Sequence, residues 1–294
     1  MGYSAPIKVN IVGIDIKSEV WSGRAMINLV DTLSEARLGT EIRSFFIPSP
    51  DILSPSDMNK FIENSPDYII FMDDFHYHFF ASSVAKKTNA KIGFASLYAQ
   101  AIKFNKVDEG RQFGVIQAPS PKNFELIRKY SDTTKFLMIG GPLAKNMGLR
   151  IKELTENAGF EKSDIVITDK WDEFREAIAS TDRETLTLIL APFQVYNEGQ
   201  LVSALEFADA INTCPSPSVT IKDIKHADPL FTLTGSPEKL GIDLGKSLIK
   251  FIKTGNSPGV VDSYSSGLTI SRGLAKKYIR EFNTPEVVGF FRHH

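Results

Sequence analysis

A cluster of polar and aromatic residues follows a short apolar run in the first third of the chain. Residues 68–72 read Tyr-Ile-Ile-Phe-Met, which is typical of a parallel strand buried on both faces. The five residues that follow are Asp73, Asp74, Phe75, His76 and Tyr77. Carboxylates, an imidazole and aromatic rings at the end of a strand could bind a ligand or exchange protons with it. We therefore expect this segment to form one wall of a small-molecule site.

The same residue types permit other interpretations. Asp73 and Asp74 could contact a ligand, could hold a metal ion, or could only cap the helix predicted to follow, since a carboxylate accepts hydrogen bonds from the first N–H groups of a helix. His76 and His78 lie two positions apart, so on a helix they point about 200° apart and cannot share an ion. We expect no metal and no cofactor.

The aromatic residues near predicted strand ends also have two interpretations. Rings lining a site would favour a flat apolar or cationic ligand. Alternatively they belong to the core of a chain with 21 Phe residues. Gly140-Gly141-Pro142 lies between a predicted strand and a predicted helix, where its N–H groups could hold an anion. We favour a tight turn, because neither the dinucleotide fingerprint nor the phosphate-loop pattern is present.

Composition limits the class of protein. The chain has 294 residues, 42% hydrophobic and 23% charged residues, and a net charge of -1, which gives no reason to expect nucleic acid as a partner. No apolar run reaches the roughly 18 residues needed to span a bilayer. Cys214 is the single cysteine, which excludes an internal disulfide. Met1-Gly2 and His293-His294 are typical of residues added for expression, so the absence of a secretory signal carries no weight.

Strand and helix patterns alternate along the chain, which indicates a doubly wound α/β fold. The pattern is interrupted at residues 117–121, Gln-Ala-Pro-Ser-Pro, and then restarts, which predicts two lobes. We expect a single helix over residues 197–212. A further helix over residues 237–253 carries Gly241 and Gly245 on one face, where we expect close approach to a sheet.

The last quarter of the chain resembles a known family. The residues that carry this resemblance are Phe231-Thr232-Leu233-Thr234-Gly235, Leu240-Gly241, Gly245, Ile252-Lys253-Thr254-Gly255, Leu268-Thr269-Ile270-Ser271 and Ala275-Lys276. They are similar to the end of ABC-transporter substrate-binding proteins, in a subfamily related to tryptophan and tyrosine importers. The earlier parts of the chain follow the same order less closely.

The resemblance implies a type I periplasmic-binding-protein fold, with two Rossmann-like lobes, a hinge and three crossovers. Lobe one would comprise residues 1–117 plus 225–261, and lobe two residues 118–224 plus 262–294. The ligand would lie in the cleft between the lobes. Carried over by position, the ligand-binding residues besides those at 73–77 are Glu19, Trp21, Ser96, Tyr98, Gln117, Ser120, Gly141, Phe193, Gln194, Asn197 and Asp228.

This chain departs from the amino-acid-binding members in its pocket. Those members present small residues after the third strand, where this chain has Asp73-Asp74-Phe75-His76. They also carry an aspartate for the ligand ammonium near the position of the neutral Gln194. Asp73, Asp74 or Asp228 could supply that charge instead. The pocket has thus been rebuilt, which argues against a standard amino acid. The resemblance itself implies a small-molecule ligand of aromatic or amino-acid-like type.

We expect a periplasmic or otherwise extracytoplasmic solute-binding protein that is not an enzyme and that delivers a small molecule to an ABC permease. A second interpretation is the ligand-sensing region of a membrane signalling protein, a histidine kinase or a chemoreceptor, with a signalling module as partner. A third is a cytoplasmic α/β enzyme with Asp73 or Asp74 as base and His76 as acid.

Overall fold

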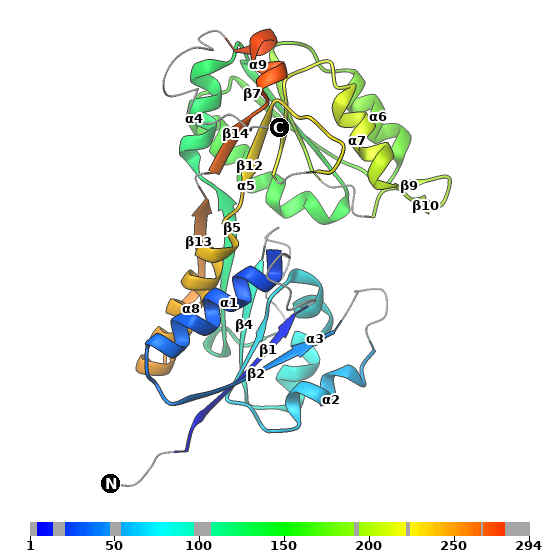
Figure 1. Ribbon diagram of the computed structural model, residues 1–294. Helices are drawn as coiled ribbons and strands as arrows, with labels where there is room; N and C mark the ends of the chain where they lie inside the picture. The colour runs from blue at the N-terminus through cyan, green and yellow to red at the C-terminus, as the bar shows by residue number, and fades with distance from the viewer. Residues whose placement is uncertain are drawn as a thin grey trace. The chain divides into compact units, whose positions relative to one another are not determined.

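Two parallel-stranded sheets form where the sequence has short apolar runs. The computed structural model describes residues 5–13, 21–47, 54–96, 107–190, 194–221, 224–265 and 267–279. The chain divides into one unit of residues 1–118 and 236–263 and another of residues 119–235 and 264–294. The chain therefore passes from one unit to the other three times (Figure 1).

The first unit contains one six-stranded sheet in the order β13-β5-β4-β3-β1-β2, in which β2, β1, β3, β4 and β5 run parallel. Its elements are β1 (Ile7–Gly13), α1 (Trp21–Glu35), β2 (Thr40–Phe46), α2 (Asp57–Ile62), β3 (Tyr68–Phe71), α3 (Asp74–Lys87), β4 (Lys91–Ser96), the 3₁₀ turn η3 (Glu109–Arg111), β5 (Gln112–Pro119), α8 (Pro237–Thr254) and β13 (Gly259–Ser265).

The second unit contains a six-stranded sheet in the order β14-β12-β11-β8-β6-β7, parallel except for β14. Its elements are α4 (Pro121–Tyr130), β6 (Lys135–Gly140), the 3₁₀ turn η4 (Pro142–Ala144), α5 (Lys145–Asn157), β7 (Lys162–Ile167), α6 (Trp171–Ala179), β8 (Thr185–Ile189), β9 (Tyr196–Asn197), β10 (Gln200–Leu201), α7 (Ala204–Asn212), β11 (Ser218–Thr220), β12 (Phe231–Thr234), β14 (Gly267–Ile270) and α9 (Arg272–Tyr278).

Strand β3 shows why continuous apolar runs form the sheet centres. All four residues of β3 are buried. Because successive strand residues point to opposite faces, both faces of the sheet must be covered there. Tyr68 and Ile70 pack with side chains of α1 and α8, whereas Ile69 and Phe71 pack with side chains of α2 and α3. The first sheet therefore has a hydrophobic core on each face.

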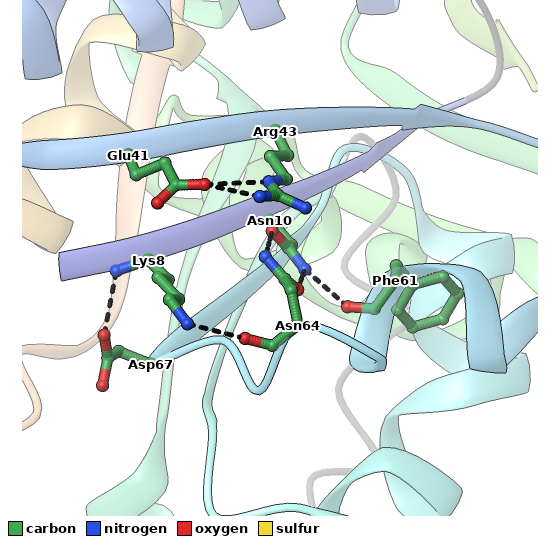
Figure 2. Close-up of polar contacts among 7 residues, drawn as sticks. All are labelled: Lys8, Asn10, Glu41, Arg43, Phe61, Asn64 and Asp67. Atoms are coloured by element: carbon green, nitrogen blue, oxygen red, sulfur yellow. Dashed lines mark hydrogen bonds and ion pairs between the residues drawn. The ribbon is translucent and has the colours of Figure 1, made fainter. Parts of the chain in front are cut away.

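Helix α2 is fastened to the sheet by a buried polar side chain on β1 (Figure 2). Asn10 is fully buried, and its Nδ2 donates to the carbonyl of Phe61 at 2.6 Å and to Oδ1 of Asn64 at 2.7 Å. Lys8 Nζ donates to the carbonyl of Asn64 at 3.0 Å. These bonds satisfy an amide that burial would otherwise leave unpaired, and they fix where α2 ends.

Helices α1 and α8 lie side by side on one face of the first sheet (Figure 1). A Cβ added at Gly241 would lie 2.0 Å from the carbonyl oxygen of Ala25, and one added at Gly245 would lie 2.7 Å from Thr32. The predicted close approach of these glycines to a sheet is therefore wrong. They permit a helix to pack on a helix, because glycine lacks the atom that would hold the backbones apart.

Two other expectations differ from the structure. The helix predicted over residues 197–212 is a hairpin, β9–β10, followed by α7. The chain reverses at Glu198 and Gly199, which both have positive φ, and Ser203 and Glu206 then form a capping box that starts α7. Residues 225–235 belong to the second unit and not to the first, because β12 pairs with β11 and β14.

The helix contact makes a stability prediction. Gly241→Ala should lower the free energy of unfolding by about 1–3 kcal/mol or more, because the new Cβ overlaps rigid backbone. Gly273 in α9 is the matched control: its added Cβ would lie 3.9 Å from the nearest atom, so Gly273→Ala should stabilise the protein by up to about 1 kcal/mol. Urea unfolding measures both. A Gly241→Ala protein as stable as the wild type would contradict this packing.

Candidate functional site

The carboxyl ends of the parallel strands are the edges at which α/β proteins bind ligands. Much of this edge in the first unit lies outside the described residues, namely 14–20 after β1, 48–53 after β2 and 97–106 after β4. Of the predicted site residues, Glu19 and Tyr98 fall in these segments, and Phe193 falls in residues 191–193 of the second unit, which are also outside the described part. Trp21 is the first residue of α1, Ser96 is the last residue of β4, and Asp74 and Phe75 are the first two residues of α3. The side chains of all four lie outside the described part.

Asp73 acts as the cap of α3. Its backbone is extended, and its Oδ1 accepts from the backbone N–H of His76 at 2.9 Å. Its second carboxylate oxygen contacts Nδ1 of His76. Asp73 therefore caps α3, and its side chain is only 13% exposed.

His76 joins α3 to the end of β2. The residue is fully buried, and its Nε2 donates to the carbonyl oxygen of Ile47 at 3.1 Å. Its ring stacks on Phe80 with an interplanar angle of 6°. Because both ring nitrogens have partners inside the protein, His76 is placed to hold the segment together and not to touch a ligand. His78, two residues further on, is exposed.

Tyr77 also belongs to the core. It is 5% exposed and packs between Phe71 and Phe94. Its hydroxyl donates to Oε1 of Gln112, at the beginning of β5. Burial raises the pKa of the Tyr77 phenol because the charged phenolate would lose its water. The structure therefore corrects the expectation for His76 and Tyr77, which stabilise the first turn of α3.

Two buried oxygen atoms of the first unit have no hydrogen-bond partner among the described residues. One is Oγ of Ser22, in the first turn of α1, and the other is Oε1 of Gln117, near the end of β5. The Nε2 of Gln117 donates to the carbonyl of Ser236, the N-cap of α8, at 2.9 Å. Because α1 and α8 pack together and an ion pair joins Arg24 to Glu238, these groups gather where the two helices begin.

Buried polar atoms are almost always paired, so each of these two unpaired oxygens requires an explanation. A bound ligand that donates hydrogen bonds would supply the missing partners. Gln117 was expected in the site from the resemblance. Ser22 was not, because a serine in the first turn of an amphipathic helix has no distinguishing signal in the sequence.

In the second unit, four predicted residues follow strands β5, β6 and β8. Ser120 is buried at the start of α4, and its side chain makes no capping hydrogen bond. Gly141 accepts from the N–H of Ala144 at 2.9 Å, which is the tight turn favoured from the sequence. Gln194 is exposed with a φ of 60°, and Asn197 donates to Glu206 at 2.7 Å.

Asp228 lies at the opposite edge of the second sheet. It comes three positions before the first residue of β12, so it lies beside the amino end of that strand and not beside the carboxyl ends. Its carboxylate accepts from Ser271 Oγ at 3.0 Å, and its N–H donates to Asn212 at 2.8 Å. The expectation that Asp228 contacts the ligand therefore does not fit its position.

Within the ranges given above, no group of three His, Cys, Asp or Glu side chains lies close enough to hold a metal ion. None of the described helices is long and apolar enough to cross a membrane.

No family model matches this sequence, and no curated protein matches it. Solved structures do match. An ABC domain in complex with L-Trp from Streptococcus pneumoniae aligns with a TM-score of 0.67 at 12% identity over 97% of this chain and 98% of that chain. A substrate-binding protein with adhesive properties from Clostridium difficile, in its ligand-free, open structure, gives 0.62 at 15% identity over 92% and 93%. An R. palustris solute-binding protein in complex with benzoate gives 0.54 at 12% over 85% and 81%.

These matches show the fold. The chain is an α/β protein with two parallel-sheet lobes that matches type I periplasmic-binding-protein structures, and the predicted fold class is confirmed. The resemblance to ABC-transporter solute-binding proteins is likewise confirmed at the level of structure. Because one fold hosts many functions, the function itself has to be argued from the site.

The double contact of Asp73 makes a prediction about stability. Asp73→Ala removes a helix cap and also leaves the buried ring of His76 without one partner, so we expect a loss of about 2 kcal/mol or more in the free energy of unfolding. Ser236→Ala removes the cap bond to the N–H of Lys239 and a 3.2 Å hydrogen bond to the carboxylate of Glu238, but it leaves no buried ring without a partner and should cost about 1 kcal/mol. Equal losses in urea unfolding would contradict the structural role of His76.

The raised pKa of Tyr77 makes a prediction about alkaline pH. Below about pH 10 the phenol is protonated in both states. As pH rises above that value the unfolded chain ionises first, so the stability that the buried phenol contributes is progressively lost up to the folded pKa. Tyr77→Phe should therefore show a shallower fall in stability between about pH 9 and 11, in urea titrations at each pH. Tyr196→Phe, at an exposed tyrosine, should leave the slope unchanged.

Proposed function

We propose that this chain is an extracytoplasmic solute-binding protein that captures a small molecule for an ABC importer. The observation that carries the proposal is the pair of buried, unpaired oxygens of Ser22 and Gln117 at the ligand-binding edge of the first sheet. The two-lobed fold, which matches solved solute-binding proteins, supports it.

The chemistry of these atoms limits the ligand. Oε1 of Gln117 can only accept a hydrogen bond, so the ligand group that reaches it carries an N–H or O–H. The hydroxyl of Ser22 can accept from the same donor or donate to a neighbouring oxygen. An amino-acid ammonium or a phenol hydroxyl meets this requirement. One matched structure holds L-Trp, whose ammonium is such a donor, and another holds benzoate, which is aromatic but has no donor. Both support an aromatic ligand, and only L-Trp also meets the hydrogen-bond requirement.

We propose that loops of both units contact the ligand and that binding thereby favours a closed form. A ligand shifts such an equilibrium only through contacts that it makes better in one form than in the other, and no covalent chemistry is required. The closed form would then be recognised by a membrane permease. In the second unit, Ser120, Gln194 and the segment around residue 193 remain the proposed contributors.

A ligand screen by thermal shift tests the function. Aromatic amino acids, hydroxylated and plain benzoates and simple sugars form the panel, and a ligand at about 100 times its dissociation constant should stabilise the folded protein by about 2.7 kcal/mol. Calorimetric titration then gives the dissociation constant. If no compound with an N–H or O–H donor binds while compounds without one do, the assignment of Gln117 fails.

Ser22→Ala separates binding from stability. Removing an unpaired buried hydroxyl should leave the ligand-free protein as stable as the wild type or more stable by up to about 1 kcal/mol. The dissociation constant of the ligand should rise roughly fivefold to tenfold, because one hydrogen bond of about 1 kcal/mol is lost.

Ser131→Ala is the matched control. Its hydroxyl is equally buried but is bonded to the carbonyl of Ile127 at 2.7 Å and to Thr133 at 2.6 Å. This variant should lose about 1 kcal/mol of stability and keep the affinity of the wild type. A Ser22→Ala protein that is destabilised yet binds normally would remove Ser22 from the site.

A further inference from the structure

Strand β2 is a seven-residue edge strand of the first sheet. It lies at the end of the strand order, and no strand of the described chain pairs with its outer side. Its sequence is Thr-Glu-Ile-Arg-Ser-Phe-Phe, which has no proline or lysine, and its two charges oppose pairing only in registers that do not match them. Such a strand has free backbone groups and a high β propensity, so it is able to pair with another strand.

The hydrogen bonds to β1 show which residues point outward. The N–H of Ile7 donates to the carbonyl of Gly39, and the N–H of Ile47 donates to the carbonyl of Gly13. Odd-numbered residues of this stretch therefore direct their backbone groups toward β1. The even-numbered residues of β2 direct theirs outward, and these are Thr40, Ile42, Ser44 and Phe46.

The side chains of the odd-numbered positions carry opposite charges. Glu41 and Arg43 lie on the same face of β2, where Oε1 of Glu41 accepts from Nε of Arg43 at 2.9 Å and from an Nη at 2.7 Å (Figure 2). Their side chains are 37% and 52% exposed. Neither charge is needed inside the unit, so both are accessible to a partner.

We propose that β2 pairs antiparallel with β2 of a second copy of this chain, about a two-fold axis at Ile42. In an antiparallel pair, outward-pointing residues must face one another, which the even-numbered residues do when Ile42 faces Ile42 of the second copy. Glu41 then faces Arg43 of the second copy, and Arg43 faces its Glu41. These positions form non-hydrogen-bonded pairs, in which side chains approach most closely.

The alternative registers are disfavoured by charge. Shifting the axis to residue 41 places the two copies of Glu41 opposite each other, and shifting it to residue 43 does the same with Arg43. Like charges directly opposite one another destabilise a strand pair. Among neighbouring registers that satisfy the backbone, only the one centred on Ile42 is charge-complementary.

An apolar groove lies beside the same edge, on the face that bears Ile42. It has a volume of about 360 Å³ and is lined by Val30, Leu33, Ser34, Arg37, Leu38, Gly39, Thr40 and Ile42. In the proposed register Ser44 faces Thr40 of the second copy, so Phe46 comes just beyond Thr40, at the groove. Phe46 is 38% exposed in the single chain, and this contact would cover its ring.

Charge reversal tests the pairing in the full chain. Sedimentation velocity over a concentration series should show a monomer–dimer equilibrium for the wild type. Arg43→Glu and Glu41→Arg should each raise the dimer dissociation constant roughly tenfold to a hundredfold, because both cross-strand pairs become like-charged. An equimolar mixture of the two variants should restore the dimer, since each then faces its opposite.

The control is the equivalent ion pair on the edge strand of the other sheet, Lys162 with Asp164 on β7. Lys162→Asp should leave the dimer unchanged. A wild type that is monomeric at every concentration, a dimer that survives both β2 variants, or one lost with Lys162→Asp would overturn the proposal.

Cross-linking tests the register. Opposite residues of a hydrogen-bonded pair lie about 5.5 Å apart between Cα atoms, within the reach of a disulfide. In a Cys214→Ser background, Ile42→Cys should form a covalent dimer on mild oxidation, whereas Ser44→Cys should not, because residue 44 faces residue 40. Cross-linking of Ser44→Cys but not Ile42→Cys would reject this register.

Discussion

The first unit depends on how closely α1 and α8 approach each other. Helix α8 is more distant in sequence from α1 than any other helix of this unit, and two glycines allow its backbone to approach that of α1. The contact buries Leu240, Leu244 and Leu248 against the sheet and sets the two helix starts next to each other. Ser22 lies in the first turn of α1, Gln117 donates to the N-cap residue of α8, and each has a buried oxygen without a partner in the described part of the chain. The candidate site is therefore a consequence of helix packing, because a wider separation would admit water to both atoms.

Residues 73–77, which the sequence indicated as the strongest candidates for ligand binding or proton transfer, have mainly a structural role. Asp73 and His76 form a tether from the first turn of α3 to the carbonyl of Ile47, and Tyr77 extends it to β5. A carboxylate that caps a helix and one that binds a ligand occupy the same position in sequence, after a buried strand and before a helix. Only the burial of the imidazole, with both nitrogens bonded, separates the two roles, and burial depends on residues distant in the chain.

Local patterns predicted the fold well, and long-range pairing limited the rest. Apolar runs such as residues 68–71 and the cap at Ser271 identified strands and helices from neighbouring residues alone. The hairpin at residues 196–201 was missed because Asn197-Glu198-Gly199 fits a helix start as well as a turn. The assignment of residues 225–235 to a unit was wrong because it depends on the pairing of β12 with β11 and β14, which are distant in the chain. Ser22 was missed because its missing partner is a property of the folded environment.

The proposed dimer edge and the ligand-binding edge meet at one residue. Ile47 directly follows β2, and its carbonyl accepts the hydrogen bond from His76 that fixes the start of α3. Pairing of β2 with a second copy would stiffen this strand, and stiffening would pass through Ile47 to the segment at residues 73–77.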